Sequence, residues 1–157
     1  MARVHGELTI DRPVTVVFDF VADQTNEPRY NPAMVRAVKA TPGPIGKGTT
    51  FSSAIRSGRR TAEMVIEFTG YDRPGRLTSH TTMRQAEIDY VLSFEPVPEG
   101  TRMRWSGVVR PHGLLRLLTP VVGRIGGRQE QRIWSSMKRL LEGGDAEATV
   151  TTRSSRG

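Results

Sequence analysis

The chain has no cysteine among its 157 residues. Disulfide bridges, thiolate nucleophiles and cysteine metal sites are therefore excluded together. No apolar run approaches the roughly 18 residues that a membrane-spanning helix needs, and residues 1–7 lack the apolar core of a signal peptide. We therefore expect a cytoplasmic protein with one domain, because this length is enough for one hydrophobic core and too short for two.

Groups that bind metals or act as nucleophiles are also scarce. His5, His80 and His112 are isolated, and none lies three or four residues from a second ligand on a helix. The glycine-rich segment 43–48 lacks the Gly-Lys-Ser/Thr ending of a phosphate-binding loop and leads into a strand. No serine has the Gly-x-Ser-x-Gly context of a hydrolase nucleophile. We therefore predict neither a metal nor a cofactor.

Positive charge is in excess, with a formal net charge of +7 at pH 7. Residues 110–139 contain seven Lys or Arg and one acid, Glu130, so most of the excess lies on or near one helix. Aromatic residues are not interleaved with these arginines, and no helix-turn-helix or zinc-finger spacing is present, so nucleic acid is not favoured as a partner. We interpret the arginines as the solvated back of a helix, with a weak contact to an anionic surface as the alternative.

The opening of the chain predicts one strand followed by two short helices. Residues 3–11 alternate between apolar and polar side chains, which is typical of a half-buried strand. Pro13 takes the first-turn position of a helix over residues 14–21, where apolar residues recur at helical spacing. A second short helix or turn at residues 25–30 ends before Asn31-Pro32, because the residue before a proline disfavours helical backbone angles.

From residue 34 onward, a period of two predicts six more strands joined by short turns. Short connections make neighbouring strands antiparallel hairpins. The predicted strands are 34–40, 48–57, 61–71, 76–83, 87–95 and 101–110. One face of this sheet is polar and solvated. It is predicted to carry His5, Glu63, Glu67, Arg76, His80, Glu87, Asp89, Glu95, Arg102, Arg104 and Arg110.

Residues 119–142 predict a long amphipathic helix at the end of the domain. Its apolar stripe consists of Val122, Ile125, Ile133, Met137 and Leu140, and its basic back of Arg124, Arg128, Arg132 and Arg139. At about 1.5 Å per residue the helix is roughly 35 Å long, but it is only about 10 to 12 Å wide. Such a helix is too narrow to fill the concave face of a wide curved sheet. This mismatch predicts a cavity between helix and sheet.

Three segments together resemble a known superfamily. They are the run from Ile10 to Asp23 (IDRPVTVVFDFVAD), Tyr30-Asn31-Pro32, and Gly43 to Phe51 (GPIGKGTTF). The pattern is similar to the START-like helix-grip (SRPBCC) superfamily, and within it to the bacterial polyketide cyclase/dehydrase and lipid-transport group, over residues 3–142. The resemblance implies an α+β fold in which a seven-stranded antiparallel sheet curves around the C-terminal helix. Two short helices close one end, and an internal pocket takes an apolar or aromatic ligand.

The predicted ligand cavity combines inward-facing strand residues with the inner face of the helix. The strand residues are Phe51, Ser53, Ile55, Met64, Ile66, Phe68, Leu77, Ser79, Thr81, Tyr90, Leu92, Met103 and Trp105, and the helix residues are Gly126, Gln129, Ile133 and Met137. Gln129 falls in the middle of the apolar face, where a buried amide needs a partner. Gly126 leaves space under the helix, although Gly126-Gly127 also fits a kink between two shorter helices. Tyr90 and Trp105 also fit a role as core fillers.

Two functions follow from this cavity. The first is binding of a hydrophobic small molecule, such as a lipid, a sterol-like or a polyketide-derived compound. The alternative is an enzyme, a polyketide cyclase, aromatase or dehydratase, in which Tyr90, Tyr30 or Arg56 supplies a proton or polarises a carbonyl. His112, at the junction into the last helical segment, would lie at the cavity mouth of the family. No carboxylate or histidine is predicted on the inner face, which favours binding.

We further expect residues 1–142 to form the ligand-binding domain and residues 143–157 a disordered tail, because the tail has no helical or strand period. The oligomeric state is open between a monomer and a homodimer.

Overall fold

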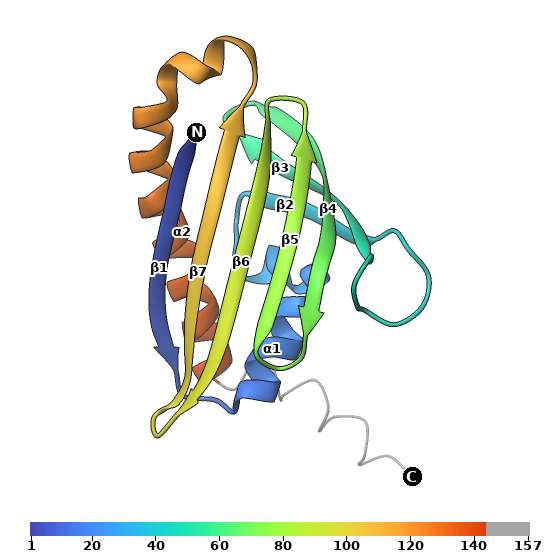
Figure 1. The fold of residues 1–157 in the computed structure, drawn as a ribbon, viewed down its shortest axis with the longest axis vertical. Helices are drawn as coiled ribbons and strands as arrows, with labels where there is room; N and C mark the ends of the chain where they lie inside the picture. The colour runs from blue at the N-terminus through green and yellow to red at the C-terminus, as the bar shows by residue number, and fades with distance from the viewer. Residues whose placement is uncertain (144–157) are drawn as a thin grey trace.

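The computed structural model describes residues 1–143, apart from the side chain of Val122 and the exposure of Gly123 (Figure 1). The predicted tail 143–157, apart from Gly143, lies outside the described residues. Within residues 1–143, no helix is long and apolar enough to cross a membrane.

The elements follow the predicted order of one strand, two short helices, six strands and one long helix. β1 (Ala2–Ile10) leads into α1 (Val14–Ala22) and the 3₁₀ helix η1 (Gln24–Arg29). The strands β2 (Met34–Lys39), β3 (Thr50–Ser57), β4 (Arg60–Asp72), β5 (Arg76–Met83), β6 (Ala86–Val97) and β7 (Gly100–Pro111) come next. A second 3₁₀ helix, η2 (Gly113–Leu118), was not expected and precedes α2 (Thr119–Glu142).

The seven strands form one antiparallel sheet in the order β1-β7-β6-β5-β4-β3-β2. The first strand pairs with the last, so β1 and β2 are the two edges. Register shifts at Phe68/Gly70 in β4 and Met34/Arg36 in β2 mark irregularities of the kind that bend strands and increase their twist. The predicted α+β helix-grip fold is confirmed: the sheet curves around α2, which runs alongside β1 (Figure 1).

Side-chain alternation along the strands separates a buried face from a polar one. In β4, Met64, Ile66 and Phe68 are buried, whereas Glu63 and Glu67 between them are exposed. The buried face is covered at one end by α1, whose Phe18 packs edge-on against Tyr71 and Phe94 with ring centroids 5.2 Å away in both cases.

The two halves of α2 have different environments. In the C-terminal half, Trp134, Met137 and Leu141 are buried against the sheet. Two hydrogen bonds fix this half: Lys138 Nζ donates to the Thr9 carbonyl at 2.7 Å, and Arg12 Nε donates to the Leu141 carbonyl at 2.7 Å. This half therefore acts as the anchor of the helix.

The N-terminal half of α2 is mostly exposed, with no buried residue among those whose burial is described. Ile125, which the sequence places on the apolar stripe, is 61% exposed, so that expectation is wrong. The reason is the rotation of the helix: Gly126 faces β1, where an added Cβ would be 3.5 Å from Val4, and Ile125 lies about 100° away from it on the solvent side. Val122, on the same predicted stripe, has its side chain outside the described residues. The helix is continuous through Gly126-Gly127, so these glycines mark no break.

Candidate functional site

A cavity of about 250 Å³ lies between the inner face of the sheet, η1 and the middle of α2. Its walls are mostly apolar. The sequence-predicted residues that line it are Ile55, Met64, Ile66, Phe68, Leu77, Ser79, Thr81, Tyr90, Leu92, Gly126, Gln129 and Ile133. Among these predicted residues, those of β3 to β6 lie on the sheet side of the cavity and those of α2 on the helix side.

Five residues placed in the cavity by sequence pattern do not line it. Phe51, Ser53, Met103, Trp105 and Met137 are at most 3% exposed and belong to the packed interior. The inner face of the sheet is longer than the cavity, and close-packed side chains fill the rest of it. Phe51, for example, packs on Phe68 with 5.4 Å between ring centroids.

The cavity also has lining residues outside the predicted set: Ala2, Val4, Gln24, Glu27, Asn31, Met34, Ile88, Val109, Glu130 and Trp134. Val4 and Ile88 lay on the apolar sides of their strands, so alternation alone was sufficient to find them. Gln24 and Glu27 lie on η1, a short 3₁₀ helix whose orientation depends on tertiary packing. No local sequence signal indicated that their side chains line the cavity.

Glu130, Tyr90 and Trp134 form a hydrogen-bonded group in the cavity wall. The Tyr90 hydroxyl donates to Glu130 Oε2 at 2.5 Å, and Trp134 Nε1 donates to the same oxygen at 3.0 Å. Trp134 Nε1 also lies 3.1 Å from the Tyr90 hydroxyl oxygen. Burial raises the pKa of Glu130, whereas the hydrogen bonds from Tyr90 and Trp134 oppose that rise. Burial, together with the charge of Glu130, raises the pKa of Tyr90.

The ring of Tyr90 has room on the inner face of the sheet because the residue paired with Tyr90 on β7 is a glycine. Tyr90 pairs across the strands with Gly107, where an added Cβ would be 2.8 Å from the tyrosine ring and 3.0 Å from Val4. The same arrangement recurs at Gly6, where a Cβ would be 2.3 Å from the Trp105 ring. Two glycines on neighbouring strands thus leave room for two aromatic rings.

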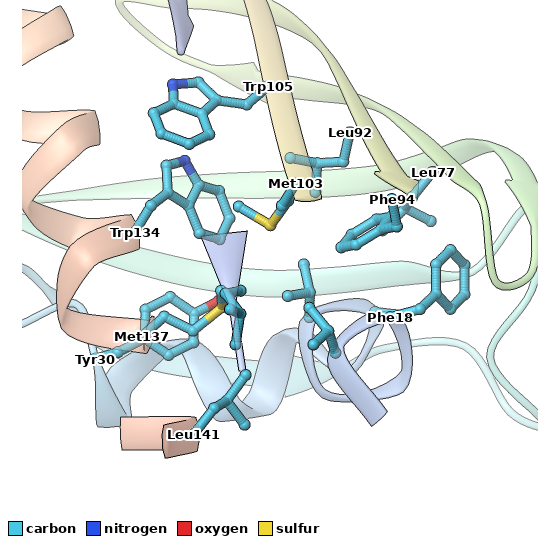
Figure 2. Close-up of a cluster of buried hydrophobic side chains, with 14 of the residues drawn as sticks. Phe18, Tyr30, Leu77, Leu92, Phe94, Met103, Trp105, Trp134, Met137 and Leu141 are labelled. Atoms are coloured by element: carbon cyan, nitrogen blue, oxygen red, sulfur yellow. The ribbon is translucent and has the colours of Figure 1, made fainter. Parts of the chain in front are cut away.

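Trp134 is the centre of an aromatic cluster beside the cavity. Its ring centroid lies 6.0 Å from that of Trp105, 6.0 Å from that of Tyr30 and 6.5 Å from that of Tyr90. Figure 2 shows Trp134 extending from α2 toward the sheet, between Trp105 and the Tyr30 and Met137 side chains. Packing in this cluster holds the Trp134 indole in the orientation in which its N–H donates to Glu130.

A second carboxyl group reaches the cavity from η1. Asn31 Nδ2 donates to Glu27 Oε1 at 2.8 Å, and the Asn31 amide oxygen accepts from the backbone N–H of Ala33 at 3.2 Å. Burial raises the pKa of Glu27 to about 7; the Asn31 hydrogen bond opposes this rise and the charge of Glu130 adds to it. Glu27 therefore changes its charge near neutral pH.

These carboxyl groups correct two expectations. Gln129 borders the cavity but is exposed, and the polar side chain that is partly buried and hydrogen-bonded there is that of the next residue, Glu130. The cavity also does not lack carboxyl groups, because Glu27 on η1 and Glu130 on α2 both line it, although no Asp, Glu or His lines it from the strands. The sequence therefore predicted the inward-facing polar residue of α2 one position too early.

Of the four residues considered for chemistry, only Tyr90 lines the cavity. Tyr30 is 3% exposed and lies behind the wall, where it packs on Trp134. Arg56 is exposed near the end of β3. His112 is exposed, with Nδ1 3.3 Å from the Arg84 carbonyl oxygen.

Residues 1–143 contain no group of three or more His, Asp or Glu side chains arranged to hold a metal ion. A second hollow, on the solvent side of α2, is lined only by polar residues: Arg128, Gln131, Arg132, Ser135 and Arg139. It is separate from the carboxyl groups and aromatic rings described above.

An antiparallel sheet curved around a long C-terminal helix, with a cavity between them, defines a START-like helix-grip protein. The chain belongs to the family described as polyketide cyclase/dehydrase and lipid transport, whose family model matches residues 1–142. Comparison with curated proteins gives no match.

Several solved structures share the fold at low sequence identity. The protein TTHA0849 of Thermus thermophilus is 14% identical, with a TM-score of 0.77, over 90% of this chain and 98% of that chain. A START superfamily protein of Mycobacterium smegmatis is 12% identical, with a TM-score of 0.77, over 91% of this chain and 99% of that chain. Ara h 8.0201 is 16% identical, with a TM-score of 0.70, over 88% of this chain and 96% of that chain.

Proposed function

We propose that this protein binds an apolar small molecule, of lipid, sterol-like or polyketide-derived character, in the cavity between the sheet and α2. The observation that carries the proposal is a cavity of about 250 Å³ with apolar walls and a few polar groups. That combination is usual for small-molecule sites, whose volumes run from about 300 to 1,000 Å³. The volume of this cavity lies just below that range, which favours a compact ligand.

The polar groups of the cavity restrict the chemistry of the ligand. Glu27 and Glu130 present carboxyl oxygens, and the Tyr90 proton is already donated to Glu130. A ligand hydroxyl can donate to these oxygens, whereas a ligand carboxylate would bring a like charge into a poorly solvated site. We therefore expect a neutral ligand with a hydroxyl group, in preference to a fatty acid anion.

Calorimetric titration with 2-naphthol and 2-naphthoate at pH 8 tests both parts of the proposal. The two probes have the same aromatic ring system and differ in the polar group. We expect 2-naphthol to bind at least about tenfold more tightly, which corresponds to about 1.4 kcal/mol. Equal affinity would contradict the expected ligand class, and no binding of either probe would count against the site.

A pair of adjacent substitutions provides the matched control. Thr81 lines the cavity, and Thr82 is exposed on the opposite face of β5. In Thr81→Phe the ring occupies ligand volume, so we expect 2-naphthol affinity to fall at least about tenfold. Thr82→Phe should bind like the wild type. If Thr81→Phe retains a native near-ultraviolet circular dichroism spectrum and wild-type affinity, the ligand binds elsewhere.

Glu27 favours a second candidate function, the cyclase, aromatase or dehydratase activity. A carboxyl group with a pKa of about 7 is suited to give and take protons near neutral pH. Glu27 also borders the cavity, where a held polyketide would present its carbonyl groups. In this mechanism Glu27 is the proton-transfer group, and Tyr90 orients Glu130 instead of supplying a proton.

Turnover of a poly-β-ketone thioester, followed by chromatography of the products, tests this activity. Glu27→Gln should lower the rate about 10² to 10⁴-fold, the usual range for loss of a general acid or base. Its affinity for 2-naphthol should change little, because the glutamine oxygen still accepts from Asn31. Glu99→Gln, on the exposed β6–β7 turn, is the control. Wild-type turnover by Glu27→Gln excludes this role, and no turnover by the wild type restricts the protein to binding.

A further inference from the structure

An exposed apolar patch covers the connection between the sheet and α2. It consists of Leu114, Leu117 and Leu118 on η2 and Val121 and Ile125 on α2, which are 85%, 80%, 52%, 53% and 61% exposed, respectively. This connection is the orange segment that follows β7 in Figure 1. Single exposed apolar residues are ordinary, but a contiguous group marks a contact surface.

The patch is accompanied by positive charge without negative charge. Arg116 lies within η2, and Arg124 and Arg128 follow on the exposed side of α2. No Asp or Glu occurs in the sequence from residue 100 to residue 129. Within residues 1–143, no ion pair involves these three arginines. Their charge is therefore available to a partner.

We propose that this apolar and basic patch is a docking surface for an anionic lipid bilayer. The leucine, valine and isoleucine side chains enter the boundary between headgroups and acyl chains. The arginines remain at the level of the lipid phosphates, with their aliphatic stems along the apolar side chains. Short amphipathic segments with a basic rim bind bilayers through this combination of apolar burial and attraction to anionic lipid.

Three other occupants agree less well with the sequence and charge. A second copy related by twofold symmetry would bring the same patch to itself, and Arg124 and Arg128 would face like charges. The segment from residue 144 to residue 157 contains one aliphatic residue larger than alanine, Val150, so it offers little apolar cover. Nucleic acid would engage the arginines but leave the leucines exposed to water.

The patch also adjoins the cavity. Ile125 belongs to the patch, and the next residue, Gly126, lines the cavity together with Ala2 at the start of β1. A bilayer bound at the patch therefore lies beside one side of the cavity, where an apolar ligand would be exchanged with lipid. This exchange depends on the proposed function, whereas docking itself does not.

Flotation of the full chain with vesicles measures docking directly. At low salt, we expect the protein to float with vesicles of equal phosphatidylcholine and phosphatidylglycerol, and much less with phosphatidylcholine alone. Each arginine near an anionic surface contributes about 1 kcal/mol, or about fivefold in affinity. Arg124→Gln/Arg128→Gln should therefore weaken binding to the anionic vesicles about thirtyfold. Leu114→Ser/Leu117→Ser should weaken it at least about tenfold.

Matched controls remove the same residue types from the sheet. Val38→Ser/Val65→Ser replaces two valines that are 51% and 49% exposed on β2 and β4, and Arg59→Gln/Arg60→Gln removes two exposed arginines at the β3–β4 turn. Both controls should float like the wild type.

Three outcomes overturn the proposal. The first is that the wild type does not float at low salt, and the second is that the control variants lose flotation as much as the patch variants do. The third is a wild-type dimer in light scattering that becomes a monomer in Leu114→Ser/Leu117→Ser, while this variant still floats like the wild type. If the wild type does not float but binds DNA tightly, and Leu114→Ser/Leu117→Ser still binds DNA, the surface is assigned to nucleic acid instead. None of these outcomes affects 2-naphthol binding, so the test of the cavity stays independent.

Discussion

At the scale of single residues, Trp134 joins the polar and apolar parts of the site. Its indole N–H donates to Glu130, and its ring contacts those of Tyr30, Tyr90 and Trp105. A carboxylate in this position would be costly without donors, because a buried charge needs hydrogen bonds to replace water. Trp134 and Tyr90 supply two of them to one oxygen of Glu130.

Removal of one of these donors should therefore lower stability. In Tyr90→Phe, Glu130 loses the hydroxyl donor, and we expect the free energy of unfolding to fall by about 1 to 3 kcal/mol. Urea denaturation followed by far-ultraviolet circular dichroism measures the change. Tyr71→Phe is the control, because its hydroxyl makes no side-chain hydrogen bond within residues 1–143, and it should change stability by less than about 0.5 kcal/mol. Equal losses in the two variants would mean that the Tyr90–Glu130 hydrogen bond contributes nothing.

The sequence was informative about the residues of strands and less so about those of helices. Alternation indicated Ile66, Thr81 and Leu92 because successive strand residues point to opposite faces. Each strand therefore offers only two possible sets of inward-facing residues. On α2, adjacent residues differ by about 100°, so an error of about 50° in the placement of the apolar stripe is enough to exchange Gln129 for Glu130. Ile125, an exposed residue that the sequence placed on the apolar stripe, biased the predicted stripe in that direction.

At the scale of elements, the same contrast holds. The seven strands and the limits of α2 followed from periodicity and turn residues, because each element is long enough to show several repeats. The 3₁₀ helices η1 and η2 are six residues each, too short to show a period. The site depends on η1, since Glu27 enters the cavity from it, and the exposed patch depends on η2. The least predictable elements therefore carry much of the candidate function.

At the scale of the whole molecule, Glu27 makes stability depend on pH. Its pKa is about 7 in the folded protein against an ordinary value of 4.5, so the folded state binds this proton more tightly. The free energy of unfolding therefore falls as pH rises from about 4.5 to about 7, by about 3 kcal/mol at most from Glu27. Glu130, whose pKa is also raised, acts in the same direction.

Urea denaturation at pH 5 and pH 8 checks this dependence. Glu27→Gln keeps an acceptor for Asn31 but cannot ionise, so we expect it to lose the part of the pH dependence that Glu27 contributes and to be more stable than the wild type at pH 8. Glu99→Gln should retain the wild-type dependence. An unchanged pH dependence in Glu27→Gln would show that Glu27 is well solvated in the folded protein.

The arrangement around Trp134 has one more consequence. The chain has two tryptophans, Trp105 and Trp134, and their ring centroids are 6.0 Å apart beside the cavity. Nearly all intrinsic fluorescence excited at long wavelength therefore arises from this one location. A tyrosine hydroxyl and a carboxylate adjoin one of the two emitters, so a change in cavity contents or in the charge of Glu130 should alter its emission. The protein thus contains an optical reporter of its own interior, which requires no added label.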